Sequence, residues 1–172
     1  MPFSYSSFLS DLSRFNNIFV SGPQRSGTRF ASTILACDLK RHFIDEVDFG
    51  VGNSDKLLLL LSKFPRSVIQ CPGMVHLLLD LVKPDDAIVF MFRPIKEILA
   101  SENRIQWPCN SDELKKLNVS SGNSCEHKYS LFESTISKSF YNCFRLDYES
   151  LSGHPSWVSK KGRSSFVWNQ TS

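Results

Sequence analysis

Short apolar runs alternate with amphipathic stretches along most of the chain, a pattern typical of α/β proteins with a parallel sheet. The strongest strand is predicted at 87–92, where six consecutive apolar residues suit a central strand buried on both faces. Shorter apolar runs predict strands at 18–20, 67–71 and 143–146, with a short strand or turn within 41–49. Helices are expected at 4–15, 28–39, 53–64, 72–82, 95–105 and 126–140, with a helical turn at 148–151. Together these elements predict an α/β fold, a three-layer sandwich with a mostly parallel central sheet.

The composition is that of an ordinary globular domain, which we expect to span residues 1–172. The chain is 41% hydrophobic and 22% charged, and no apolar run reaches the length needed to cross a membrane. A net charge of +3 is too mild to indicate nucleic acid, so an anionic small ligand is the expected partner. We therefore predict no membrane and no nucleic-acid partner, and a cytoplasmic location. The polar stretch 107–125, rich in Ser and Asn, is expected to be a surface or lid loop.

Residues 19–30 contain the clearest functional signal. An apolar strand passes through a turn that contains Gly22 and Gly27, and then enters a helical pattern. Such a loop turns its backbone N–H groups inward, and the helix N-terminus adds positive potential. The segment therefore predicts a site for a phosphate or a similar anion. Four side chains add hydrogen-bond donors to it: Arg25, Ser26, Thr28 and Arg29.

The two glycines have the spacing of the Walker A pattern G-x-x-x-x-G-K-[ST], but Thr28 stands at the lysine position. An ordinary ATP or GTP loop is therefore disfavoured. The segment instead resembles the 5′-phosphosulfate loop of sulfotransferases that use 3′-phosphoadenosine-5′-phosphosulfate (PAPS), which reads roughly G-x-x-[KR]-[ST]-G-T-[TR]. This resemblance implies a P-loop NTPase-like fold and a PAPS site. The residues that it implies for cofactor binding are Gly22, Pro23, Gln24, Arg25, Ser26, Gly27, Thr28 and Arg29.

A second part of the resemblance is Arg93, which follows the 87–92 strand and is itself followed eight positions later by Ser101. In PAPS sulfotransferases an arginine and a serine at these places bind the 3′-phosphate, and a guanidinium fork and a hydroxyl suit that anion. The segment 144–151 is similar to the late Y-E-x-L segment of the family. The chain departs from the family in its short length and in Arg25, where many members have lysine. The family's basic glycine loop is matched only vaguely, by residues 160–163.

Sulfuryl transfer needs a base for the acceptor and positive charge near the departing phosphate. The resemblance gives the second task to Arg25. Similarity to carbohydrate sulfotransferases gives the first task to Glu46, while His42 and His76 remain open as alternatives. No metal is expected, because a sulfuryl group has less charge than a phosphoryl group. The five cysteines form no C-x-x-C pair, which favours reduced thiols over a zinc site.

The sequence thus predicts a sulfotransferase that moves a sulfuryl group from PAPS to a hydroxyl or amine of a carbohydrate or small-molecule acceptor. The other product is 3′-phosphoadenosine-5′-phosphate (PAP). One alternative is a P-loop nucleotide phosphotransferase or hydrolase, against which the missing Walker lysine argues. The other alternative is a non-catalytic nucleotide-binding module, which the short chain favours.

Overall fold

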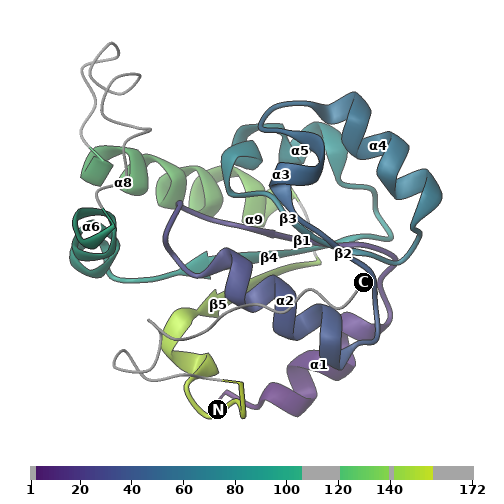
Figure 1. Cartoon of the computed structure of the whole chain (residues 1–172), viewed down its shortest axis with the longest axis horizontal. Helices are drawn as coiled ribbons and strands as arrows, with labels where there is room; N and C mark the ends of the chain where they lie inside the picture. The colour runs from purple at the N-terminus through teal and green to yellow at the C-terminus, as the bar shows by residue number, and fades with distance from the viewer. Residues whose placement is uncertain (1–2, 106–120, 140–141, 157–172) are drawn as a thin grey trace.

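A five-stranded parallel sheet forms the centre of the protein, as the computed structural model in Figure 1 shows. The structure describes residues 3–105, 121–139 and 142–156. The strand order is β2-β3-β1-β4-β5, and every neighbouring pair in this sheet is parallel. The strands are β1 (Ile18–Ser21), β2 (Phe43–Ile44), β3 (Val68–Gln70), β4 (Ala87–Phe92) and β5 (Cys143–Asp147). The predicted α/β fold is therefore confirmed.

Helices cover both faces of the sheet and make the three layers (Figure 1). The α-helices are α1 (Tyr5–Ser13), α2 (Thr28–Asp38), α3 (Glu46–Phe49), α4 (Ser54–Lys63), α5 (Leu78–Leu81), α6 (Ile95–Arg104), α8 (Ser121–Leu131) and α9 (Ser137–Ser139). The segments η1 (Pro72–Leu77) and η3 (Tyr148–Leu151) are 3₁₀-helical, and η2 (Phe132–Ile136) is π-helical.

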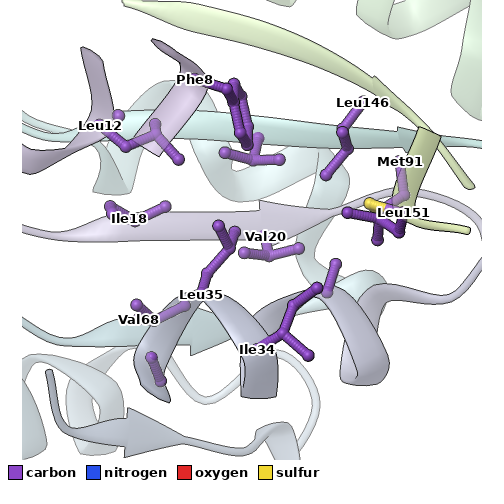
Figure 2. Packing of buried hydrophobic residues seen from close by; sticks show 14 of the residues in the cluster. Phe8, Leu12, Ile18, Val20, Ile34, Leu35, Val68, Met91, Leu146 and Leu151 are labelled. Carbon is purple, nitrogen blue, oxygen red and sulfur yellow. The ribbon is translucent and has the colours of Figure 1, made fainter. Parts of the chain in front are cut away.

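Successive residues of β1 point to opposite faces of the sheet and so divide the hydrophobic core into two clusters. Ile18 and Val20 belong to the cluster that packs against α1 and α2, shown in Figure 2. Phe19 belongs to the other cluster, which packs against α3, α4 and α5. All residues of β4 are buried, as the continuous apolar run predicts.

Helix α8 begins earlier than the sequence predicts. The expected loop over 107–125 is wrong at its end, because 121–125 already belong to this helix. The physical reason is that residues 121–124 are Ser-Gly-Asn-Ser, so no apolar position marks the first turn of this helix in the sequence. The remainder of the expected loop, 107–120, lies outside the described residues.

The segment 72–82 is predicted as one helix and instead forms η1 followed by α5. Met74, inside η1, has non-helical backbone angles (φ −105°, ψ 17°). The N–H of Gly73 donates to the Glu46 carboxylate, with 2.8 Å between Gly73 N and Glu46 Oε1. This bond ties the start of the segment to α3 and holds it in a tight turn.

Among the described helices, none combines the length and the apolar character needed to cross a bilayer. Four cysteines in the described part of the chain are free thiols: Cys37, Cys71, Cys125 and Cys143. The basic residues at 160–163 that the sequence offers as candidates lie outside the described residues.

Candidate functional site

The loop after β1 lies where the strand order of the sheet changes direction. The chain places β2 and β3 on one side of β1, and β4 and β5 on the other. In open parallel sheets, ligands bind beyond the carboxyl ends of the strands at such a point. The loop from Gly22 to Gly27 follows β1, and Arg93 follows the neighbouring β4, so both lie at this edge.

The loop has the tight backbone path that its glycines predict. Three of its residues have positive φ: Gly22 (+139°), Arg25 (+65°) and Gly27 (+101°). A Cβ atom on Gly22 would lie 2.8 Å from the carbonyl oxygen of Met91, so the loop packs directly on β4 and only glycine fits there. Helix α2 starts at Thr28, which brings its free N-terminal N–H groups to the loop.

Ser26 places a hydroxyl without a hydrogen-bond partner inside the described part of the loop. Its side chain is fully buried, and within the described part of the chain no hydrogen-bond partner reaches its Oγ atom. A buried hydroxyl of this kind costs free energy unless another group completes its hydrogen bonding. The hydroxyl and the backbone N–H groups around it fit the oxygens of a phosphate or sulfate group.

Tyr148, the first residue of η3, packs against the loop. A Cβ atom on Gly27 would lie 2.4 Å from Cδ2 of Tyr148, so the aromatic ring fills the space beside that glycine. The guanidinium carbon of Arg93 lies 4.4 Å from the centroid of the same ring, which is a cation–π contact. One side chain from the end of β5 thus positions both the loop and Arg93. Its only signal in the sequence is the Y-E-x-L-like segment 144–151.

Three arginines converge on the Ser101 hydroxyl and the loop. Arg25 donates to Ser101 Oγ from Nε at 3.3 Å and from Nη2 at 3.2 Å. Arg104 donates from Nη2 to the same oxygen at 3.5 Å, and Arg93 Nη1 donates to the Arg25 carbonyl oxygen at 3.1 Å. Arg93 and Ser101 are both buried. The structure therefore brings together Arg25, Arg93 and Ser101, which the sequence offers as candidates from three separate segments.

The guanidinium groups of this cluster repel one another. Burial is the first cause that lowers the pKa of Arg25, and the charges of Arg104 and Arg93 lower it further. Glu97 offsets part of the charge, because its Oε2 lies 3.2 Å from Arg93 Nε. A bound anion would relieve the remaining repulsion, so the cluster suits a phosphate group.

Glu46 lies on the other side of the loop and is joined to it by a chain of hydrogen bonds. Gln70 donates from Nε2 to Thr28 Oγ1 at 3.3 Å, and its Oε1 accepts from the Glu46 N–H at 3.3 Å. The Glu46 side chain is buried, and this burial raises its pKa, while the Gly73 N–H and the Lys128 charge act in the opposite direction. A buried carboxylate with a raised pKa is suited to act as a general base.

Three other candidates make contacts outside this hydrogen-bond chain. Arg29 is 59% exposed and pairs with the buried Asp45, the residue before Glu46, with 3.0 Å between Arg29 Nε and Asp45 Oδ2. His42 stacks on Phe64 at 4.1 Å, and its carbonyl accepts from the first residue of β3, at the edge of the sheet opposite the loop. His76 is exposed on η1. Of the three possible bases, Glu46, His42 and His76, it is Glu46 that hydrogen bonds through Gln70 join to Thr28 at the end of the loop.

Comparison with solved structures identifies the fold. The structure is similar to shikimate kinase from Acinetobacter baumannii in complex with shikimate, with a TM-score of 0.55, 16% identity, and coverage of 80% of this chain and 86% of that chain. Weaker similarity is found to the Bacillus subtilis YorR protein in complex with phosphorylated GDP (TM-score 0.48) and to Bacteroides thetaiotaomicron shikimate kinase (TM-score 0.47). Each of these two is 13% identical and covers 76% of this chain and 85% of its own.

No protein-family model matches the sequence, and a search of curated proteins finds no match. At 16% identity, the likeness to the Acinetobacter enzyme shows the fold alone. The five-stranded parallel sheet of this chain agrees with that likeness. The chain therefore has a P-loop NTPase-like α/β fold.

Proposed function

We propose that this protein is a PAPS-dependent sulfotransferase that acts on a hydroxyl or amine of a carbohydrate or small-molecule acceptor. The observation that supports this most is the cationic cluster beside the phosphate-type loop, in which Arg25 and Arg104 contact Ser101 and Arg93 contacts the Arg25 carbonyl. A nucleotide with a second phosphate, remote from the transferred group, needs a second cationic site. PAPS has such a phosphate at its 3′ position.

In this proposal the two parts of the site hold the two ends of the cofactor. The loop N–H groups and the Ser26 hydroxyl hold the phosphosulfate, and Arg93, Arg104 and Ser101 hold the 3′-phosphate. Arg25 connects the two parts, because its backbone belongs to the loop and its guanidinium contacts Ser101. When bound, PAPS supplies an activated sulfuryl group and a phosphate leaving group.

Glu46 is the proposed base. The acceptor oxygen or nitrogen forms a bond to sulfur, and the bond between sulfur and the 5′-phosphate oxygen breaks, its electron pair remaining on that oxygen. The acceptor proton passes to the Glu46 carboxylate. The Gly73 N–H, 2.8 Å from Oε1, fixes the orientation of this carboxylate, and burial raises its pKa toward the range useful for a base. Arg25 stabilises the charge that develops on the departing phosphate. The step needs no metal ion in this proposal.

The second candidate is a P-loop phosphotransferase, and the likeness to a shikimate kinase supports it more directly than it supports sulfuryl transfer. Walker A loops place a lysine on the phosphates and the following Ser or Thr on Mg²⁺. Here the first position is Thr28, which accepts a hydrogen bond from Gln70, and the second is Arg29, paired with Asp45. Because both residues differ in chemistry from the kinase pair, we rank sulfuryl transfer first. A non-catalytic nucleotide-binding module remains the third candidate.

Calorimetric titration of the purified protein with PAP, ATP and AMP tests the proposal. PAP is expected to bind more tightly than AMP, which lacks the 3′-phosphate. Arg93→Ala should weaken PAP binding by about 10- to 100-fold, the value of a charged hydrogen-bond donor lost from a phosphate site. Arg14→Ala, at an exposed arginine after α1, is the matched control and should bind PAP like the wild type.

Arg93 also contacts Glu97 and Tyr148, so its variant needs a check of folding by circular dichroism. Ser101→Ala provides a milder second test of the same site, with an expected loss of about 5-fold or more in PAP affinity. Preference for ATP over PAP, together with transfer of its γ-phosphate, would favour the phosphotransferase. PAP binding that is equal in the wild type and in both site variants would contradict the proposed 3′-phosphate site.

A further inference from the structure

Lys128 brings a cationic side chain to the Glu46 side of the loop. It lies on helix α8, is half-buried, and donates from Nζ to the carbonyl oxygen of Pro72 at 3.4 Å. Pro72 begins η1 shortly after β3, and the next residue, Gly73, donates to Glu46 Oε1 at 2.8 Å. Lys128 and Glu46 therefore approach the same turn from two different helices.

The surroundings of Lys128 show that its charge interacts with this site. Burial lowers its pKa, while Cys125, Glu46 and Glu102 act in the opposite direction. In turn, the charge of Lys128 lowers the pKa of Glu46 against the effect of burial. These titratable neighbours come from three elements: Glu46 from α3, Glu102 from α6, and Cys125 from α8 itself.

The cations of the loop are directed to other places. No lysine occurs between Gly22 and Arg29. Arg25 donates from two nitrogens to Ser101, and Arg29 is paired with Asp45 near the surface. Lys128 thus adds a cation from α8 to the Glu46 side of the loop, where the charge of Arg29 is already paired with Asp45.

We propose that Lys128 is a catalytic residue that donates hydrogen bonds to a non-bridging oxygen of the sulfuryl group as this group passes from PAPS to the acceptor beside Glu46. The inference rests on the proposed function and assigns to Lys128 the stabilising task that a Walker loop gives to its own lysine. An ammonium group has three donors, and the one bond to Pro72 leaves others for a ligand. Negative charge shared among sulfuryl oxygens is what such a donor stabilises.

The comparison of PAP with PAPS isolates this contact, because the two ligands differ only by the sulfuryl group. Lys128→Met removes the charge and keeps a side chain of similar length. In calorimetry it should leave PAP affinity within about 2-fold of the wild type and weaken PAPS binding by about 10-fold, as expected for a lost charged hydrogen bond. Lys128→Arg keeps the charge and should retain most of the preference for PAPS. Lys138→Met, at an exposed lysine of α9, should change neither affinity.

The outcomes separate the two proposals. Equal weakening of PAP and PAPS by Lys128→Met, or no effect on either, would overturn the role of Lys128 and leave the proposed function standing. Absence of PAP binding by folded wild-type protein would overturn the proposed function, and this inference with it. Release of sulfate from PAPS to water provides a second readout that needs no identified acceptor. Its rate in Lys128→Met should fall, and the acidic limb of its pH profile should move to higher pH, because Glu46 loses the cation that lowers its pKa.

Discussion

Gly27→Ala tests how closely Tyr148, the residue after β5, packs against the phosphate-type loop. Gly27 has φ +101°, and a Cβ atom there would lie 2.4 Å from Cδ2 and 2.6 Å from Cε2 of Tyr148. Positive φ costs a residue other than glycine about 1–2 kcal/mol. Forcing a carbon into a packed ring costs about 1–3 kcal/mol more, because the ring or the loop must move. The expected loss in the free energy of unfolding is therefore about 2–5 kcal/mol.

Gly52→Ala separates the two contributions. Gly52 also has positive φ (+76°), but a Cβ atom there would meet nothing within 4 Å, so the variant should lose only the backbone part of about 1–2 kcal/mol. Urea unfolding followed by circular dichroism measures both variants under the same conditions.

Tyr148→Leu completes a double-mutant cycle with Gly27→Ala. Leucine keeps an apolar side chain and removes the ring atoms that the new methyl group would meet. In the double variant, the effect of Gly27→Ala should fall by about 1–3 kcal/mol, which is the size of the steric part. The reasoning is refuted if Gly27→Ala costs no more than Gly52→Ala, or if Tyr148→Leu does not reduce its cost.

Two further variants test buried carboxylates. Because burial raises the pKa of Glu46, its stabilising contribution is present below the ordinary carboxyl pKa and is lost as the pH rises through the raised value. Glu46→Gln should thus be more stable than the wild type at pH 8 in urea unfolding, and the difference should shrink toward pH 4; a difference independent of pH would contradict this. Asp86 is 2% exposed and accepts from the Asn17 N–H and side-chain amide and from the Lys83 N–H. Asp86→Ala should lower the free energy of unfolding by about 3 kcal/mol, roughly 1 kcal/mol per lost bond; Asp85→Ala, at an exposed position, offers the comparison, and equal effects would count against this estimate.

The sequence by itself determined the layered α/β fold and the position of the glycine loop after β1. Both follow from local signals: apolar runs specify buried strands, and two glycines at the start of a helix specify a tight loop. It also indicated that Arg93 and the loop lie near each other, because the carboxyl ends of parallel strands meet at one edge of the sheet. Ser101, on the helix that follows, was expected there from the resemblance to PAPS sulfotransferases.

The tertiary structure alone decided which side chains meet across that edge. Nothing near Lys128 in the sequence indicates that α8 would bring it to Pro72, and nothing near Tyr148 indicates contact with Gly27. Nothing in the sequence indicates that Arg25 and Glu46 lie on opposite sides of the loop. The physical reason is that these contacts join segments far apart in the chain, and depend on how helices and strand ends pack. Local propensity and spacing specify the elements, whereas packing between them specifies the site.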